Sequence, residues 1–284
     1  MNFVDLIRYI VYGLTQGFFE VLPISSAGLV SFIQEISQQD FSEVNNNFFL
    51  AFVNLGSLFA VIIYLKKRIR KILVESYRYV VKKSTDDEHK KSFMFLKNIV
   101  IAILPTGIIG IVYSFLNIDY KEYGMVILGV GALLTGTILY YARFNTDRYT
   151  NTIVNRRQAW YIGVFQVLSI LPGVSRLAVT TAAGTHRELS HETSLTFSLL
   201  IYIPISLGTI FVMLVTSGLG NEVFSVPGYT IIYYLASLLF SFIATMVALK
   251  YLFIITRKGN FRFFYILNLI FGVVALFLGV SQLN

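Results

Sequence analysis

Six long apolar segments dominate this sequence and restrict its fold more than any other feature. They cover approximately residues 48–65, 94–115, 124–142, 194–216, 229–256 and 261–281. Each approaches the roughly 20 residues that an α-helix needs to cross a ~30 Å hydrocarbon core. Since 56% of the residues are hydrophobic and only 13% are charged, the chain is too apolar for an ordinary soluble domain. The predicted fold class is therefore all-α: a polytopic membrane protein.

The distribution of charge explains a net charge of +8 without a nucleic-acid partner. Lysine and arginine concentrate in the connections 66–91, 143–158 and 257–262 between apolar segments. By contrast, the connections 34–47 and 217–228 contain acidic residues and no lysine or arginine. The positive-inside rule therefore places the three basic connections in the cytoplasm and both termini outside. The chain has no cysteine, which excludes disulfides and thiolate sites.

Two further apolar stretches, residues 3–33 and 160–184, have polar groups, a proline and glycines near their centres. Broken helices of this kind persist at membrane depth only when they are buried in protein or line a wet cavity. We therefore expect each stretch to enter the membrane and return on the same side. The predicted architecture is six transmembrane helices plus two re-entrant helical hairpins.

An internal repeat connects the two hairpins. At an offset of 150 residues, three pairs of identical residues align: Gly13 with Gly163, Gln16 with Gln166, and Ser25 with Ser175. We expect one integral membrane domain, 1–284, made of halves of about 1–142 and 143–284 inserted with opposite orientation. Inverted repeats of this type carry polar ligands where their broken helices meet. Chance matches between apolar segments are the alternative.

The first hairpin carries a polar loop at residues 16–28. Pro23 stops one helix, and Ser25 or Ser26 caps the next by accepting hydrogen bonds from its free N–H groups. Such a helix start attracts an anion such as phosphate. Glu20 lies in a segment that should be buried, where a carboxylate requires a cation, a metal or a proton as its partner. The simpler interpretations are a plain helix cap for the serines and a structural ion pair for Glu20.

The second hairpin carries the corresponding loop. Pro172 and Gly173 break the helix, and Ser175 is positioned to cap the next one. Arg176 follows, and its guanidinium offers five N–H donors in a geometry that matches phosphate oxygens. A salt bridge to Glu20 without a ligand is the alternative, and it is compatible with an empty phosphate site.

Both loops resemble signatures of one known family. Residues 20–28 are similar to the first signature of the undecaprenyl-diphosphate phosphatase family, known for bacitracin resistance, and residues 172–176 are similar to the second. Segments 54–58, 157–160, 165–166 and 197–204 also resemble that family's sequence, in the family's order. The resemblance therefore covers nearly the whole chain.

The resemblance implies hydrolysis of a polyprenyl diphosphate, of undecaprenyl or dolichyl type, to the monophosphate carrier lipid and phosphate. It implies a multi-pass protein of the cell membrane with its active site facing outside, and a divalent cation, Mg²⁺ or Ca²⁺, as cofactor. The oligomeric state stays open, with a homodimer as one option. The residues carried over are Glu20, Ser26 and Arg176 for catalysis, Glu20 for the metal, and Gln16, Ser25, Gly28, Ser175 and Thr180 for substrate binding.

Some positions depart from the family pattern. Gln16 replaces a glutamate, Leu29 a histidine, Leu177 a serine, and Asn268 a late arginine. We expect His186 and His191 to be solvated loop residues on the cytoplasmic side and not substitutes for the lost histidine. The replacements leave a second function open: a catalytically weak relative that binds a polyprenyl phosphate and translocates it across the membrane.

Overall fold

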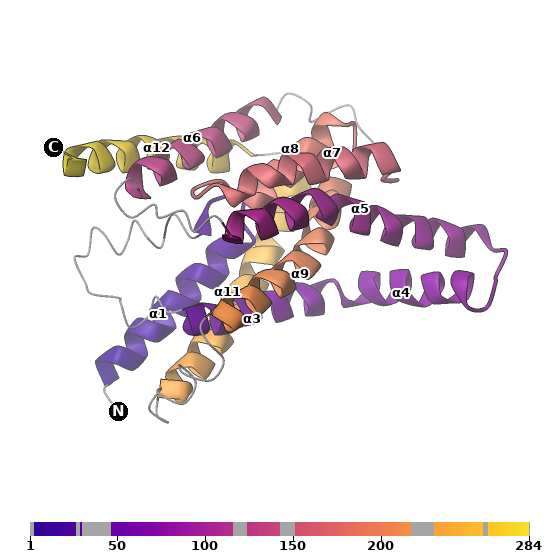
Figure 1. Ribbon diagram of the computed structural model, residues 1–284, viewed down its shortest axis with the longest axis horizontal. Helices are drawn as coiled ribbons and strands as arrows, with labels where there is room; N and C mark the ends of the chain where they lie inside the picture. Colours follow the sequence, from indigo (N-terminus) through magenta and orange to yellow (C-terminus); the bar gives the residue numbers. More distant parts are fainter. Residues whose placement is uncertain are drawn as a thin grey trace.

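The computed structural model is built of α-helices (Figure 1). It describes residues 3–26, 29, 47–115, 124–142, 151–216, 230–257 and 261–283. Gly28, the connection 217–228 and nearly all of the connection 34–47 lie outside the described residues. The helices in chain order are α1 (Phe3–Glu20), α3 (Asn47–Tyr64), α4 (Lys66–Val80), α5 (Asp87–Phe115), α6 (Gly124–Ala142), α7 (Arg156–Gln166), η2 (Val167–Ile170), α8 (Arg176–His186), α9 (His191–Thr216), α11 (Thr230–Arg257) and α12 (Arg262–Leu283).

Every predicted membrane span forms a helix, and the all-α polytopic class is confirmed. Helices α5, α6, α9, α11 and α12 are each long and apolar enough to cross a membrane. Helix α3 reaches that length only together with α4, whose axis is bent from it by 70°. Among the described residues there are therefore five candidate spans, or six if α3 and α4 form one broken span.

The basic connection 66–91 is helical over most of its length, which corrects its interpretation as a loop. Helix α4 packs against the first turns of α5, and the two project together at the right of Figure 1. Ile72 and Ser76 are the buried residues of α4, and they lie one turn apart on a single face. Its basic residues occupy other positions of the helix, so the number of charges in the segment does not reveal the helical pattern.

Both predicted helix breaks are confirmed. Helix α1 ends at Glu20, and a new helix starts at Ser26, where the Leu29 amide donates to the Ser25 carbonyl over 3.0 Å. In the second hairpin η2 ends at Ile170 and α8 begins at Arg176.

Each hairpin packs against the other half of the chain. Helix α1 lies along α11, and α7 lies along α5. Glycines make these approaches close: a Cβ at Gly13 would overlap the Ser237 backbone, and a Cβ at Gly163 would overlap the Ala102 backbone. The third apolar segments of the two halves, α6 and α12, pack together at the top left of Figure 1. Helices from residues 1–142 therefore pack closely against helices from residues 143–284.

A row of hydroxyls on α11 fixes α1 in place. Ser237 donates to the Tyr9 carbonyl over 2.6 Å, and Thr245 donates to the Gly17 carbonyl over 2.7 Å. Ser241, between them, donates to the Val53 carbonyl of α3 over 2.8 Å. Small residues and interhelical hydroxyl bonds are the usual means of holding helices together in a membrane. The row therefore fixes the helix that carries Glu20 at its end.

Candidate active site

The two broken turns meet each other. The Ser175 hydroxyl donates to the Leu22 carbonyl over 3.5 Å, joining the break of the second hairpin to that of the first. Ser175 also caps α8, accepting from the Ala178 amide at 3.4 Å. The predicted cap is thereby confirmed. A helix N-terminus with free N–H groups therefore lies beside the first turn, which favours negative charge there.

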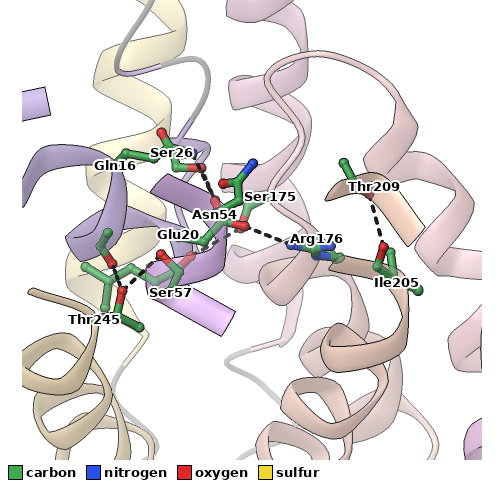
Figure 2. A network of polar contacts seen from close by, with 12 residues as sticks. Gln16, Glu20, Ser26, Asn54, Ser57, Ser175, Arg176, Ile205, Thr209 and Thr245 are labelled. Carbon is green, nitrogen blue, oxygen red and sulfur yellow. Dashed lines mark hydrogen bonds and ion pairs between the residues drawn. The ribbon is translucent and has the colours of Figure 1, made fainter. Parts of the chain in front are cut away.

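Glu20 connects the signature residues of both hairpins (Figure 2). Its Oε1 accepts a hydrogen bond from Arg176 Nη2 over 2.9 Å, and the two side chains form an ion pair through this contact. Its Oε2 accepts from Ser26 Oγ at 2.8 Å and from Gln16 Nε2 at 3.2 Å. The carboxylate side chain is 13% exposed and the guanidinium side chain 24% exposed. The buried charge thus has the cationic partner that it requires, and the two charged groups remain reachable.

Asn268 holds the first turn in place through a side-chain hydrogen bond. Its Nδ2 donates to the Pro23 carbonyl over 2.9 Å and to the Phe264 carbonyl of its own helix over 2.7 Å. The side chain is fully buried. Asn268 therefore supports the loop that carries the serines, and it is not placed to contact a phosphate as an exposed arginine would be.

Thr135 of α6 holds the second turn in the same way. Its hydroxyl accepts from the Ser175 amide at 3.0 Å and lies 3.5 Å from the Gly173 carbonyl. Gly173 has φ = +86°, a conformation that glycine adopts without steric cost. A Cβ at Gly131 would overlap the Pro172 carbonyl. The turn before Arg176 therefore lies directly on the backbone of α6.

The other predicted substrate-binding residues lie close by but are buried. Ser25 is 6% exposed and Thr180 is 1% exposed. The Thr180 hydroxyl donates within α8, to the Arg176 carbonyl over 2.9 Å. A role for these hydroxyls in substrate binding stays a prediction.

The residues at two family departures pack in the apolar core. Leu177 is buried there, and Leu29 packs against the same cluster, so neither supplies a titratable group. His186 is exposed and contacts Tyr161 at 3.2 Å, as expected of a solvated residue. The expectation for His191 is wrong, because it begins α9, its ring nitrogens are buried and its ring packs against Phe261.

The described residues contain no cluster of three or more His, Asp or Glu side chains that would hold a metal by themselves. The Glu20 carboxylate is the anionic oxygen ligand at the pair of turns, and the Gln16 amide faces it with its nitrogen, Nε2 donating to Oε2 over 3.2 Å. Mg²⁺ is commonly bound by one or two carboxylates together with substrate phosphates and water. The donor set therefore fits a divalent cation that arrives with a diphosphate.

One contact in the site was not predicted from the sequence. The Arg176 guanidinium carbon lies 4.4 Å from the centre of the Tyr202 ring, on α9. Tyr202 falls inside an apolar span and inside the family-like segment 197–204, and neither feature assigns it a role. The sequence does contain one signal for this contact: Tyr202 is a large aromatic residue two positions before Pro204, in a helix expected to pass the broken hairpin.

Comparison with known proteins finds one family, and relatives that match nearly the whole chain. The family described as bacitracin resistance protein BacA matches residues 9–274. An undecaprenyl-diphosphatase of Oceanobacillus iheyensis is 32% identical over 97% of this chain and 97% of its own. Undecaprenyl-diphosphatase 1 of Bacillus licheniformis is 32% identical over 97% and 99%. An undecaprenyl-diphosphatase of Acholeplasma laidlawii is 26% identical over 96% and 97%.

Proposed function

This chain belongs to the bacitracin resistance protein BacA family, and from that premise we propose that it is an integral membrane phosphatase. Its substrate is a polyprenyl diphosphate of undecaprenyl or dolichyl type, and its products are the monophosphate carrier lipid and phosphate. The observation that carries this proposal is Glu20, hydrogen-bonded on one oxygen to the Ser26 hydroxyl and on the other to Arg176. The names of the relatives point to the same reaction.

In the first step the Ser26 oxygen attacks the terminal phosphorus of the diphosphate. Glu20 takes the hydroxyl proton, because its Oε2 lies at 2.8 Å from Ser26 Oγ, within the reach that a general base requires. A bond forms between the serine oxygen and phosphorus as the bond from phosphorus to the bridging oxygen breaks. The electron pair of that bond goes to the bridging oxygen, which leaves as part of the polyprenyl monophosphate. This leaving group takes the proton from Glu20, so the carboxylate is regenerated.

In the second step water hydrolyses the phosphoserine. Glu20 takes a proton from the attacking water and returns it to the departing Ser26 oxygen, which regenerates the hydroxyl and releases phosphate. Arg176 and the free N–H groups at the start of α8 stabilise the negative charge of the transferring phosphoryl group in both steps. Catalysis thus rests on positioning and charge, supplied by one residue cluster from two hairpins.

A divalent cation, Mg²⁺ or Ca²⁺, completes the proposal. Glu20 would hold it together with the diphosphate of the substrate. When bound, such an ion neutralises charge on the phosphate oxygens.

The proposed location is the cell membrane, with the site facing outside and the halves 1–142 and 143–284 forming an inverted repeat. Two features support this. Helix α1 begins and α12 ends at the left of Figure 1, opposite the basic α4 at the right. The aligned glycines, Gly13 and Gly163, each approach the equivalent helix of the other half.

Labelling of single cysteines tests the orientation, since the native chain contains none. Asp40→Cys is expected to react with an impermeant maleimide on intact cells, and Lys83→Cys only after the membrane is opened, because basic connections stay inside. Equal labelling of both positions on intact cells would contradict the proposed topology.

The reaction itself is tested by phosphate release from undecaprenyl and dolichyl diphosphates in detergent. We expect measurable release that depends on added Mg²⁺ or Ca²⁺ and stops with a chelator. A protein that binds polyprenyl phosphate but releases no phosphate with any metal would exclude the phosphatase and favour the lipid translocator.

Restoring the family's residues is expected to increase the rate. Gln16→Glu adds a carboxylate beside Glu20, which strengthens metal binding, and Leu29→His adds a proton carrier. General acid–base assistance is worth ~10²–10⁴-fold in rate, so we expect the double variant to turn over faster at saturating metal. Two adjacent carboxylates repel each other unless a cation lies between them, so Gln16→Glu should also lower the metal concentration that gives half-maximal release. An unchanged rate together with an unchanged metal requirement would show that these departures do not limit catalysis.

A further inference from the structure

The guanidinium of Arg176 has two different contacts. Glu20 accepts a hydrogen bond from its edge, through one N–H of Nη2 at 2.9 Å. Its Cζ lies over the face of the Tyr202 ring, 4.4 Å from the ring centre. The first contact comes from the opposite hairpin and the second from α9, which packs directly against α8.

The face contact supplies what the edge contact lacks. A single hydrogen bond fixes the position of one nitrogen, but the guanidinium plane can still rotate about it. A ring packed against Cζ restrains that rotation, and it uses no N–H donor, because the attraction is to the π electrons. Within the described residues, Glu20 is the group to which the guanidinium donates a hydrogen bond. Its remaining donors are thus left for a ligand.

Burial makes the face contact stronger. Tyr202 is 3% exposed, so water does not compete for that face of the cation. Cation–π attraction increases as the pair is desolvated. The ring also compensates part of the cost of holding a permanent cation in an apolar segment.

We propose that Tyr202 is a positioning residue whose ring fixes the plane of the Arg176 guanidinium and so presents its free N–H donors to the phosphates of the substrate. This inference rests on the proposed function in taking a diphosphate as the ligand. It assigns to α9 a part in substrate recognition that belongs to neither broken hairpin.

The test compares Tyr202→Phe, which keeps the ring, with Tyr202→Leu, which removes it. The probes are farnesyl diphosphate, for equilibrium binding to the purified protein in detergent, and undecaprenyl diphosphate, for steady-state kinetics. We expect Tyr202→Phe to bind within about twofold of wild type. Tyr202→Leu should raise Kd and KM by about two- to thirtyfold, the range of a cation–π contact, with a smaller change in kcat. Equal losses in both variants would assign the effect to the hydroxyl and overturn the proposal.

A double-mutant cycle separates positioning from damage to the fold. In an Arg176→Ala background, Tyr202→Leu should cause no further loss of farnesyl diphosphate binding, because the group that it orients is gone. The matched control is Tyr234→Leu, which removes a buried tyrosine from the cluster with Phe49. It should lower thermal stability but leave Kd unchanged.

The same cycle distinguishes this inference from the proposed function. Additive losses from Tyr202→Leu and Arg176→Ala would overturn the positioning role even if the wild type releases phosphate normally. Coupled losses of binding in a wild type that releases no phosphate would support the positioning role and refute the phosphatase.

Discussion

Ser26→Ala will abolish phosphate release from undecaprenyl diphosphate. The variant loses the oxygen that attacks phosphorus and the hydroxyl bonded to Glu20 at 2.8 Å. Removal of a nucleophile from a catalytic unit costs up to about 10⁶-fold in kcat, so we expect a loss of at least about 10³-fold. Binding of farnesyl diphosphate should persist, because Arg176 and the start of α8 are unchanged. The measurement is phosphate release and ligand binding on the same purified sample.

Two serine variants serve as controls for that result. Ser25→Ala removes the neighbouring hydroxyl, for which we expect a smaller loss, mostly in KM. Ser281→Ala removes an exposed hydroxyl that bonds within the last turns of α12, and it should behave as wild type. If Ser25→Ala eliminates release and Ser26→Ala does not, the nucleophile has been assigned to the wrong serine. If neither does, the phosphoserine mechanism is refuted.

The fold could be predicted from the sequence wherever the length of an apolar segment determines the structure. The six apolar segments and the two breaks at Pro23 and Pro172 correspond to helices and turns at the expected places. Helix α4 was missed because ten lysines and arginines in residues 66–91 signal an exposed connection, while its buried face is only a few residues wide. Composition reports the average of a segment, and a narrow helical face does not change that average.

The sequence predicted the part of the site in which a charged side chain requires an opposite charge. It did not predict the side chains that hold the backbone of the two turns by hydrogen bonds. A glutamate and an arginine that both lie in apolar segments imply each other, and the structure pairs them. Thr135 and Asn268 bond to backbone atoms of turns more than 35 residues away in sequence. A threonine or an asparagine inside an apolar span gives no indication in the sequence of which backbone atom it will bond to. Tyr202 was missed for the same reason, because an aromatic residue in a membrane helix usually only packs.

Arg176→Lys is expected to be nearly as damaging as Arg176→Ala, with both lowering kcat/KM by about 10²–10³-fold, as loss of a donor to a transition-state anion does. Lysine keeps the charge but has no planar group. It therefore loses the paired N–H donors that match two phosphate oxygens. It also loses the guanidinium carbon that lies over the Tyr202 ring, 4.4 Å from the ring centre in the wild type. The measurements are kcat/KM with undecaprenyl diphosphate and Kd for farnesyl diphosphate.

Arg187→Ala is the matched control for the arginine variants, because it removes the same charge from the other end of α8, where the side chain is exposed. We expect it to stay within about twofold of wild type in kcat/KM. Arg176→Ala leaves Glu20 buried without its cation, so each variant must first elute as a single species in detergent. Among well-folded variants, a lysine that retains most of the binding and turnover would mean that Arg176 acts only as a point charge. In that case the planar guanidinium, with its contacts to Glu20 and Tyr202, would have no part in recognising the diphosphate. A lysine variant that loses as much as the alanine variant would show that the planar group is required.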